Sequence, residues 1–408
     1  MGGLNDLSGS ILRGEAMESE RLAESLSLAS EWLVRIAQVK EEVPTGNVRT
    51  HHKHTYWRGA IKGEYSVKDK EWSFFAPVWH TGQAVKALVM AHKVLKEDWL
   101  LEAAKAGADF ILHNQVRDKT DPDSGLILAY EDFPDKVTIS GILGCLDGLI
   151  YLSEASGEES YWEAAVEAAR WVLDRAYQGD GLFYDLYDPE GRRFVEYAYK
   201  IRGRPLLDDG ILGKVYKKTG EKRFLEIFLE TCDRLLRDED PPGNWVNYPP
   251  CNPVTGSIHP RHAYWWGRPM IYAFQETGDR RYLACALRSG QWYKKAQRRD
   301  GGLIRGTYRD FSTNSFGHAT SGICCAMILW QELDKVLGER LFQKPFELGL
   351  EYCLNMQFRQ VSDPNLKGCI LEKVLPPDGT DRSPYHIRDL GTIFFVQAVS
   401  MYLGETSS

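Results

Sequence analysis

The N-terminal region of this chain lacks any long apolar run. Its first segment, MGGLNDLSGSILRGEAMESE, is broken throughout by small, polar and charged residues. A signal peptide needs an uninterrupted apolar stretch, and a membrane span needs a longer one. We therefore expect residues 1–17 to be disordered and the protein to have no contact with a membrane.

Cysteine pairs and cofactor motifs are also missing. The eight cysteines form no CxxC pair and no regular spacing, and most of them lie in apolar helical stretches. Such thiols are small buried hydrophobes, which is typical of a reducing compartment and predicts a cytoplasmic protein. The chain has no GxGxxG, no P-loop sequence and no GxSxG. We therefore expect no nucleotide cofactor and no hydrolase built on a nucleophile elbow.

The chain has neither a complete set of metal ligands nor a net positive charge. His51, His52 and His54 lie close together in a loop-like segment, but no Asp or Cys completes a ligand set there, so we expect no metal. The formal net charge is -7. A nucleic-acid partner would need clustered Lys and Arg, so we expect none.

An internal repeat dominates what the chain does contain. Five segments each consist of an apolar helix, a small turn and a second helix, at a spacing of roughly 60 residues. A period that holds two helices and a long loop fits a closed ring of helical hairpins. The sequence predicts an all-α fold, an (α/α)6 barrel formed by residues 18–408 as a single domain. The five copies begin at Ala91, Tyr151, Val215, Ala273 and Leu333.

The predicted ring has two kinds of connection. Turns from an inner to an outer helix are tight and centre on glycines that suit helix C-caps. Connections from an outer helix to the next inner helix are long, and long loops on one face of a scaffold commonly carry function. We therefore expect the site where these loops meet the N-termini of the inner helices, which favour negative charge. The glycines are Gly157, Gly220, Gly278 and Gly338, and an amphipathic helix over 18–41 is expected to fill the sixth outer position.

Two adjacent carboxylates open the third inner helix. Asp208 and Asp209 lie in the segment PLLDDG. Either of them can simply cap the helix. A carboxyl group in an aromatic surrounding, however, has a raised pKa and can act as a general acid. The sequence does not decide which of the two residues points inward.

Indoles and cations open the fourth inner helix. The segment HPRHAYWWGRP contains His262, Trp265, Trp266 and Arg268. An arginine fork binds a carboxylate with two hydrogen bonds and an indole stacks on a sugar ring, so this mixture suits an acidic sugar. Residues at the other inner-helix starts that can face the same site are Trp79, His80, Tyr130, Glu131, Asp132, His318, His386 and Arg388.

Three segments resemble a known family. LLDDGILGKVYKKTGE, YWWGRPMIYAF and HATSGICCAMILWQEL are similar, in this order, to segments of the unsaturated glucuronyl and rhamnogalacturonyl hydrolases, glycoside hydrolase families 88 and 105. The resemblance implies that Asp209 is catalytic and that Trp266 and Arg268 lie near the substrate. In that family a proton is added to the C4=C5 bond of the sugar and water adds at C5. The segment KVTISGIL lacks the family's second Asp, which leaves a saturated substrate open.

A second resemblance points to the same class of sugar. FFAPVWHTGQAVKALVMAHKVLKEDWLLEAA, and AYEDFP followed by GLFYDL, are similar to the helical domain of D-glucuronyl C5-epimerases. This resemblance implies that Tyr184, Glu131 and Asp132 exchange the C5 proton.

We therefore expect a glycoside hydrolase that acts on uronate-terminated oligosaccharides by Asp general acid/base chemistry. A uronate C5-epimerase or a polysaccharide lyase on the same barrel is the alternative. A non-catalytic carbohydrate-binding protein is a third possibility, and the oligomeric state stays open.

Overall fold

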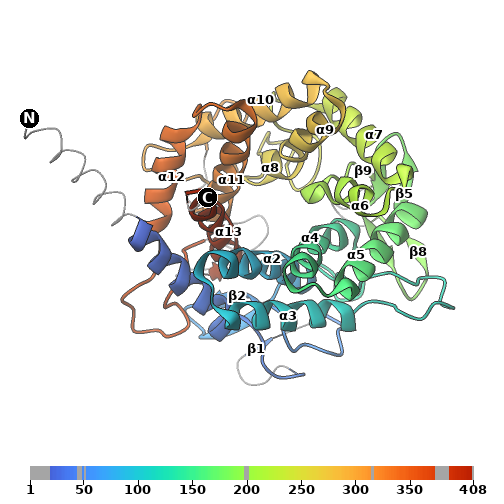
Figure 1. Cartoon of the computed structure of the whole chain (residues 1–408), viewed down its shortest axis with the longest axis horizontal. Helices are drawn as coiled ribbons and strands as arrows, with labels where there is room; N and C mark the ends of the chain where they lie inside the picture. Colours follow the sequence, from blue (N-terminus) through green and yellow to red (C-terminus); the bar gives the residue numbers. More distant parts are fainter. Residues whose placement is uncertain are drawn as a thin grey trace, which may run out of the picture.

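The computed structural model is a ring of helices around a central axis (Figure 1). It describes residues 19–43, 48–49, 52–196, 202–313, 317–372 and 386–406. An inner layer of helices lines the axis and an outer layer surrounds it, which confirms the predicted (α/α)6 barrel. The inner elements are α2 Pro77–Leu95, α4 Ile139–Ser156, α6 Ile211–Thr219, α8 His262–Gly267 with α9 Pro269–Thr277, α11 Thr320–Leu337 and α13 Leu390–Thr406. The outer elements are the helical residues 19–32 with the π-helical turn η1 Leu33–Ala37, α3 Asp98–His113, α5 Glu159–Trp171 with the π-helical turn η2 Val172–Ala176, α7 Lys222–Asp238, α10 Arg280–Ala296 and α12 Gln343–Asn355.

The two layers differ in how their residues are buried. In the inner helix α11 every residue from Thr320 to Gln331 is buried, because the helix is covered by its inner neighbours and by the outer layer. The outer helix α7 buries a single stripe at helical spacing, which runs from Phe224 to Leu235. The repeat in the sequence therefore alternates between helices that are apolar all round and helices that are amphipathic.

Glycines end the inner helices, as predicted. Gly157, Gly220, Gly278 and Gly338 have φ values of 76°, 71°, 71° and 67°, in the left-handed region. A residue with a Cβ is strained there, whereas glycine is not, so the four C-caps are confirmed. The resulting turns are tight and lie at one end of the ring. The long connections meet the N-termini of the inner helices at the other end, which we call the loop face.

The ring closes between its first and last hairpins. Helix α13 packs against both α2 and α11. Residues 19–37 fill the sixth outer position, as predicted: Trp32 Nε1 donates to the backbone oxygen of Asn365 at 2.7 Å. Just beyond them, Gln38 Nε2 donates to the backbone oxygen of Ala103 in α3 at 2.9 Å.

Short strands in the long connections are the feature that sequence periodicity did not predict. Each has two to four residues, too short to show an alternating pattern. The β10–β2 pair joins the last connection to the first and sets Arg388 opposite Glu64. The sheets are β1 Val48–Arg49, β3 Glu71–Phe74, β2 Gly63–Ser66 and β10 His386–Arg388; β4 Val137–Thr138, β7 Leu186–Asp188 and β8 Arg193–Phe194; and β5 Tyr177–Gly179, β6 Leu182–Tyr184 and β9 Arg202–Arg204.

The cysteines lie in the core, and the described helices are too short or too polar to cross a membrane. All eight cysteines are buried and free, which confirms them as small core residues. Across the described ranges, no helix combines the length and the apolar character that crossing a membrane requires.

The close contact between α2 and α4 gives a test of this packing. A Cβ atom on Gly82 would lie 2.4 Å from Cys145 Cα, so alanine would force the two helices apart. We expect Gly82→Ala to lower the free energy of unfolding by about 2 kcal/mol or more, measured by urea denaturation. Gly404→Ala is the matched control, because a Cβ there meets nothing within 4 Å. Its effect should stay below about 1 kcal/mol, and equal losses in the two variants would contradict this packing.

Candidate active site

Asp208 and Asp209 begin the third inner helix in a short 3₁₀ turn, η3 Asp208–Gly210. Asp209 has φ 50° and ψ 11°, a left-handed conformation that residues other than glycine rarely adopt. Neither carboxylate makes a capping hydrogen bond, and the N-cap of α6 is Gly210. The capping role that the sequence allowed is therefore not what the structure shows, and the two side chains have different surroundings.

Asp209 is held by four donors. Gln83 Nε2 donates to its Oδ2 at 2.8 Å. The other oxygen, Oδ1, accepts from Arg268 at 3.1 Å, from the Tyr264 hydroxyl at 3.3 Å and from Lys86 Nζ at 3.4 Å. The Asp209 side chain is only 6% exposed. Because two of the four donors are cations, this carboxylate is committed to an ion-pair network.

The ion pairs continue across the axis of the ring. Arg268 also forms a bidentate pair with Glu332 of α11 at 2.6 to 3.0 Å. In the other direction Lys86 lies 2.7 Å from Asp147 of α4, which also pairs with Lys214 of α6. Lys86 and Asp147 are fully buried, where charges persist only when they are paired. We call this row of alternating charges the axial charge chain: Glu332, Arg268, Asp209, Lys86, Asp147 and Lys214.

Asp208 has a different environment. Its Oδ2 atom is buried and has no hydrogen-bond partner within the described ranges. Burial raises the pKa of Asp208 to about 7; the charge of Arg204 opposes this rise, and the charge of Asp209 adds to it. Arg204 is itself buried and donates to Asp185 at 2.8 Å. Asp208 is therefore a carboxyl group that stays protonated up to nearly neutral pH.

His262 lies near the same arginine. Its ring centre is 4.1 Å from that of Trp266, and its Nδ1 is 2.9 Å from Cys251 Sγ. The Nε2 atom is buried and has no partner in the part of the chain that the structure describes. Burial, and then the charge of Arg204, hold the pKa of His262 well below its usual range. His262 is therefore a neutral imidazole, and its lowered pKa makes it a weak base.

Arg261 lies between two indoles. Its guanidinium carbon is 5.3 Å from the ring centre of Trp265 and 5.5 Å from that of Trp79. The two rings meet edge to face at 6.2 Å, and both residues are half-buried. Arg261 Nη1 donates to Ser321 Oγ at 2.7 Å and to Glu372 at 3.4 Å. A fixed guanidinium beside indole surface is the combination that binds a sugar carboxylate.

Cations gather around His259, whose ring stacks on Trp265 at 4.9 Å. Burial holds the pKa of His259 well below its usual range, and the charges of Arg261, Arg305 and Arg388 lower it further. Positive charge from three different connections is therefore concentrated at this point of the loop face. Such a concentration attracts an anionic ligand.

The predicted residues of the first and sixth inner helices are buried against carboxylates. His80 Nδ1 lies 2.7 Å from Asp389 Oδ1, and both side chains are fully buried. Arg388 donates to one oxygen of Glu64 at 2.5 and 3.0 Å, and His386 lies 3.8 Å from the other oxygen. These side chains pack beneath the loop face and hold the first and last connections together.

Tyr130 and Glu131 belong to a separate cluster of rings. Tyr130 is buried, and its ring lies 4.8 Å from that of His54. Burial lowers the pKa of His54 to about 3. His52 Nε2 is 2.7 Å from the backbone oxygen of Glu131. His51 lies outside the described residues, and among those described no three His, Cys, Asp or Glu side chains gather as a metal ion would require.

The remaining predicted residues are spread over other connections. Tyr184 is half-buried and stacks on Phe194 at 4.6 Å. His318 Nδ1 lies 2.7 Å from the hydroxyl of Tyr352 in the outer helix α12. Asp132 is half-buried in the connection before α4. The predicted residues that the structure gathers around Arg204 and Arg261 are Asp208, His262, Trp266, Trp79 and Trp265.

Several residues of the site were not predicted, although some carried a signal. Lys86 and Asp147 are single charges within the apolar segments QAVKALVM and GCLDGLI, and a charge in a buried helix requires a buried partner. Arg261 lies one helical turn before Trp265, in the segment that supplied the predicted indoles. Arg204 reaches Asp208 from strand β9, and its local sequence gives no sign of this contact.

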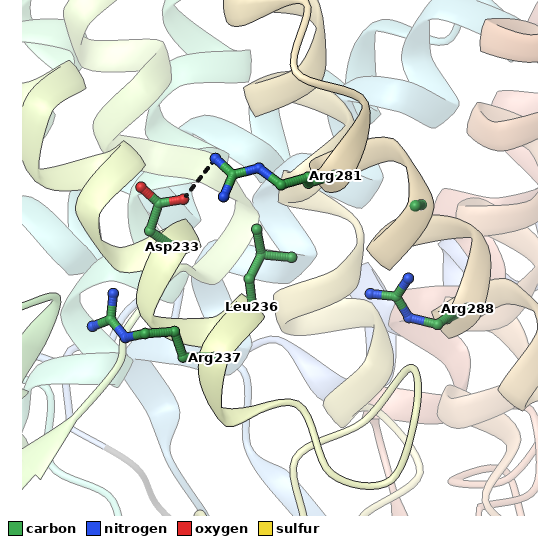
Figure 2. A pocket seen from close by; sticks show the side chains of 6 residues that line it. Asp233, Leu236, Arg237, Arg281 and Arg288 are labelled. Atoms are coloured by element: carbon green, nitrogen blue, oxygen red, sulfur yellow. Dashed lines mark ion pairs between the residues drawn. The ribbon is translucent and has the colours of Figure 1, made fainter.

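Two cavities lie away from the loop face. One, of about 290 Å³, is lined by Asp209, Arg268, Glu332 and residues near the C-terminal ends of α11 and α13. It meets the axial charge chain from the end of the ring that carries the tight turns. The other, of about 570 Å³, lies on the outer wall between α7 and α10 (Figure 2). Each arginine that lines it already pairs with a carboxylate, so we assign the cavity no role.

Similar structures cover almost the whole chain. No family model matches the sequence, and no curated protein matches it. An unsaturated glucuronyl hydrolase specific for heparin has a TM-score of 0.67 at 12% identity, over 95% of this chain and 98% of its own. The cellobiose 2-epimerase of Spirochaeta thermophila has a TM-score of 0.63 at 13% identity, over 95% and 98%. A family 76 mannosidase of Bacteroides thetaiotaomicron has a TM-score of 0.63 at 12% identity, over 95% and 100%. The barrel is thus the fold of several sugar-processing enzymes, and the predicted likeness to glucuronyl hydrolases is confirmed at the level of fold.

Proposed function

We propose that this protein is an enzyme that hydrolyses uronate-terminated oligosaccharides and that Asp208 is its proton donor. One observation carries the proposal: Asp208 has a buried oxygen without a partner within the described ranges, and its pKa is raised to about 7. A general acid needs a pKa near the working pH, and burial beside Arg204 and Asp209 supplies it. The family resemblance implied Asp209 for this role. The four donors on Asp209 favour its neighbour instead.

Arg261 and its two indoles form the proposed binding site for the uronate. The guanidinium binds the sugar carboxylate, and Trp79 and Trp265 offer flat surfaces for the pyranose ring. The cations around His259 make this end of the site attractive to an anion. A sugar without a carboxylate would lose its hydrogen bonds to the guanidinium and the attraction of these cations, so the proposed specificity is for acidic sugars.

The surroundings of Asp208 favour an unsaturated uronide as substrate. Hydrolysis of a saturated glycoside needs an acid and a second carboxylate as nucleophile or base. The two neighbouring carboxylates, Asp185 and Asp209, are already bound to cations. Hydration of a C4=C5 bond needs only one acid. Asp208 gives its proton to C4, water adds at C5, and the proton of that water returns to the Asp208 carboxylate. The hemiketal formed at C5 then opens to a ketone and leaves a hydroxyl on C1. The resulting C1 hemiacetal breaks down to an aldehyde, which cleaves the C1–O bond and releases the rest of the oligosaccharide as an alcohol.

Ultraviolet absorbance of the C4=C5 bond tests the proposal. We expect the absorbance of a lyase-generated oligosaccharide with an unsaturated uronate at its end to fall on addition of the protein. The matched control is the same oligosaccharide with a saturated glucuronate, which should stay intact. A rise in absorbance from a uronate polymer would show a lyase, and no cleavage of either oligosaccharide would contradict the proposed hydrolysis.

A second candidate function is epimerisation of a sugar. The buried Nε2 of His262, which has no partner among the described residues, favours it, because an epimerase needs a nitrogen or oxygen base that can reach a carbon-bound proton. The similarity to a cellobiose 2-epimerase is a further reason to test it. An epimerase would leave the absorbance and the chain length unchanged and would introduce deuterium from heavy water at the inverted carbon.

A further inference from the structure

Two carboxylates that follow each other in the chain have opposite surroundings. We propose that Asp209 is a positioning residue: its carboxylate, fixed by the ion pairs of the axial charge chain, sets the charge beside Asp208 and takes no part in bond cleavage. This inference rests on the proposed function, because it assigns the proton transfer to Asp208. It changes the role that the family resemblance implied for Asp209.

The backbone accounts for the division of roles. The left-handed conformation of Asp209 lets its carboxylate bind residues of α2 and the fourth inner helix while Asp208 lies beside Arg204. Such a conformation is strained in a residue other than glycine and persists only when its surroundings fix it. Here four hydrogen bonds fix it. The Asp209 carboxylate is thus held by protein donors on both of its oxygens.

The charges around the pair determine what a substitution will do. Asp208 faces Arg204, Asp185 and Asp209, with Glu131 further out beside Arg204. Asp209 faces Lys86 of α2, with Tyr264 and Arg268 of the fourth inner helix. Glu332 pairs with Arg268, Asp147 pairs with Lys86, and Lys214 pairs in turn with Asp147. The axial charge chain has three acidic and three basic members, so its formal charge is 3 − 3 = 0. Removal of any single member leaves a net charge near Asp208.

The sign of the effect follows from Coulomb's law. Without Asp209 the chain is left with one excess positive charge, which stabilises the ionised form of Asp208. Without Lys86 the chain is left with one excess negative charge, which stabilises the protonated form. The influence of Asp209 on the proton affinity of Asp208 already has this sign, because the Asp209 charge raises the pKa of Asp208.

Direct titration of Asp208 tests the inference without a substrate. The carboxyl-carbon NMR signal of Asp208 is assigned by its loss in Asp208→Asn and is followed with pH in the full-length protein. We expect the titration midpoint of Asp208, its pKa, at about 7 in the natural protein. It should move down by on the order of one pH unit in Asp209→Asn and up by a similar amount in Lys86→Met.

Two further variants serve as matched comparisons. Lys214→Met removes the same charge as Lys86→Met but at the end of the chain, so its upward shift should be smaller. Arg268→Met removes the other cation beside Asp209 and should repeat the upward shift. In each variant that turns over substrate, the pH at which kcat/KM falls should move in the same direction as the titration. A purely structural role for Asp209 would leave that pH unchanged.

The direction of the titration shifts decides whether the role proposed for Asp209 is right. Opposite shifts in Asp209→Asn and Lys86→Met support the inference, and shifts of equal sign or no shift in either variant overturn it. If Asp209→Asn does not fold, Lys86→Met decides alone: an upward shift supports the inference and an unchanged midpoint overturns it. Opposite titration shifts in a protein that cleaves no uronide would refute the proposed function and leave the charge relation between the two residues standing.

Discussion

Asp208→Asn should abolish turnover of a uronate-terminated oligosaccharide while it leaves the fold intact. A positioned general acid contributes about 100- to 10,000-fold to a rate, so we expect kcat to fall by about three orders of magnitude. The fold should tolerate the change, because asparagine has nearly the same shape and the buried Oδ2 has no partner among the described residues. The measurement is the initial rate with the unsaturated substrate, together with a thermal melt of the variant.

Two control variants make this result specific. Asp310→Asn changes an exposed carboxylate in another long connection and should keep full activity. Asp209→Asn should retain measurable turnover with a shifted pH dependence. If Asp208→Asn were fully active and Asp209→Asn inactive but folded, then Asp209 would be the acid, as the family resemblance implied, and the proposed assignment would be wrong.

Arg261→Lys should separate binding of the acidic sugar from the chemistry. Lysine keeps a positive charge opposite Glu372 but loses the planar fork that binds a carboxylate in bidentate fashion. We expect kcat/KM to fall by about 100-fold, equivalent to about 3 kcal/mol, with most of the loss in KM. Removing the cation entirely would leave Glu372 buried and unpaired, so lysine is the cleaner substitution.

The substrate and a second arginine provide the comparisons for that experiment. The uronamide, which lacks the negative charge, should be a poor substrate that is nearly insensitive to Arg261→Lys. Arg268→Lys alters the arginine that the sequence analysis favoured. This side chain binds Glu332 through two nitrogens at 2.6 to 3.0 Å and Asp209 at 3.1 Å, whereas Arg261 meets Glu372 at 3.4 Å. Its effect on KM should therefore be much smaller. A larger KM effect at Arg268 than at Arg261 would place the sugar carboxylate at the axis of the ring.

The barrel architecture could be predicted because the sequence patterns that indicate it each lie within a short segment of the chain. A repeat of helical hairpins, apolar spacing within each helix and a glycine at each tight turn are all visible in short segments of sequence, and Gly157, Gly220, Gly278 and Gly338 took their predicted conformations. The place of the site at the inner-helix starts followed from the long loops, and Asp208 with Trp265 lies there.

The partners of each side chain could not be predicted in the same way. Arg268 binds Glu332, which is 64 positions further along the chain, and no local pattern indicates that contact. The difference between Asp208 and Asp209 depends on one left-handed backbone angle in a residue that seldom adopts it. Arg204 reaches the site from a three-residue strand that helical periodicity cannot detect. Long-range ion pairs and one unusual turn therefore decide the chemistry that the sequence left open.

The pH dependence of kcat/KM on an unsaturated uronide tests the central claim most directly. Asp208 must be protonated to act, and its pKa in the folded protein is raised to about 7. The rate should therefore be constant at lower pH and fall, with the slope of a single proton, as the pH rises through about 7. His259 and His262 do not interfere, because burial holds their pKa values well below the usual range. A rate that rises with pH through the same range would show that a base, not an acid, starts the reaction, and would contradict this account.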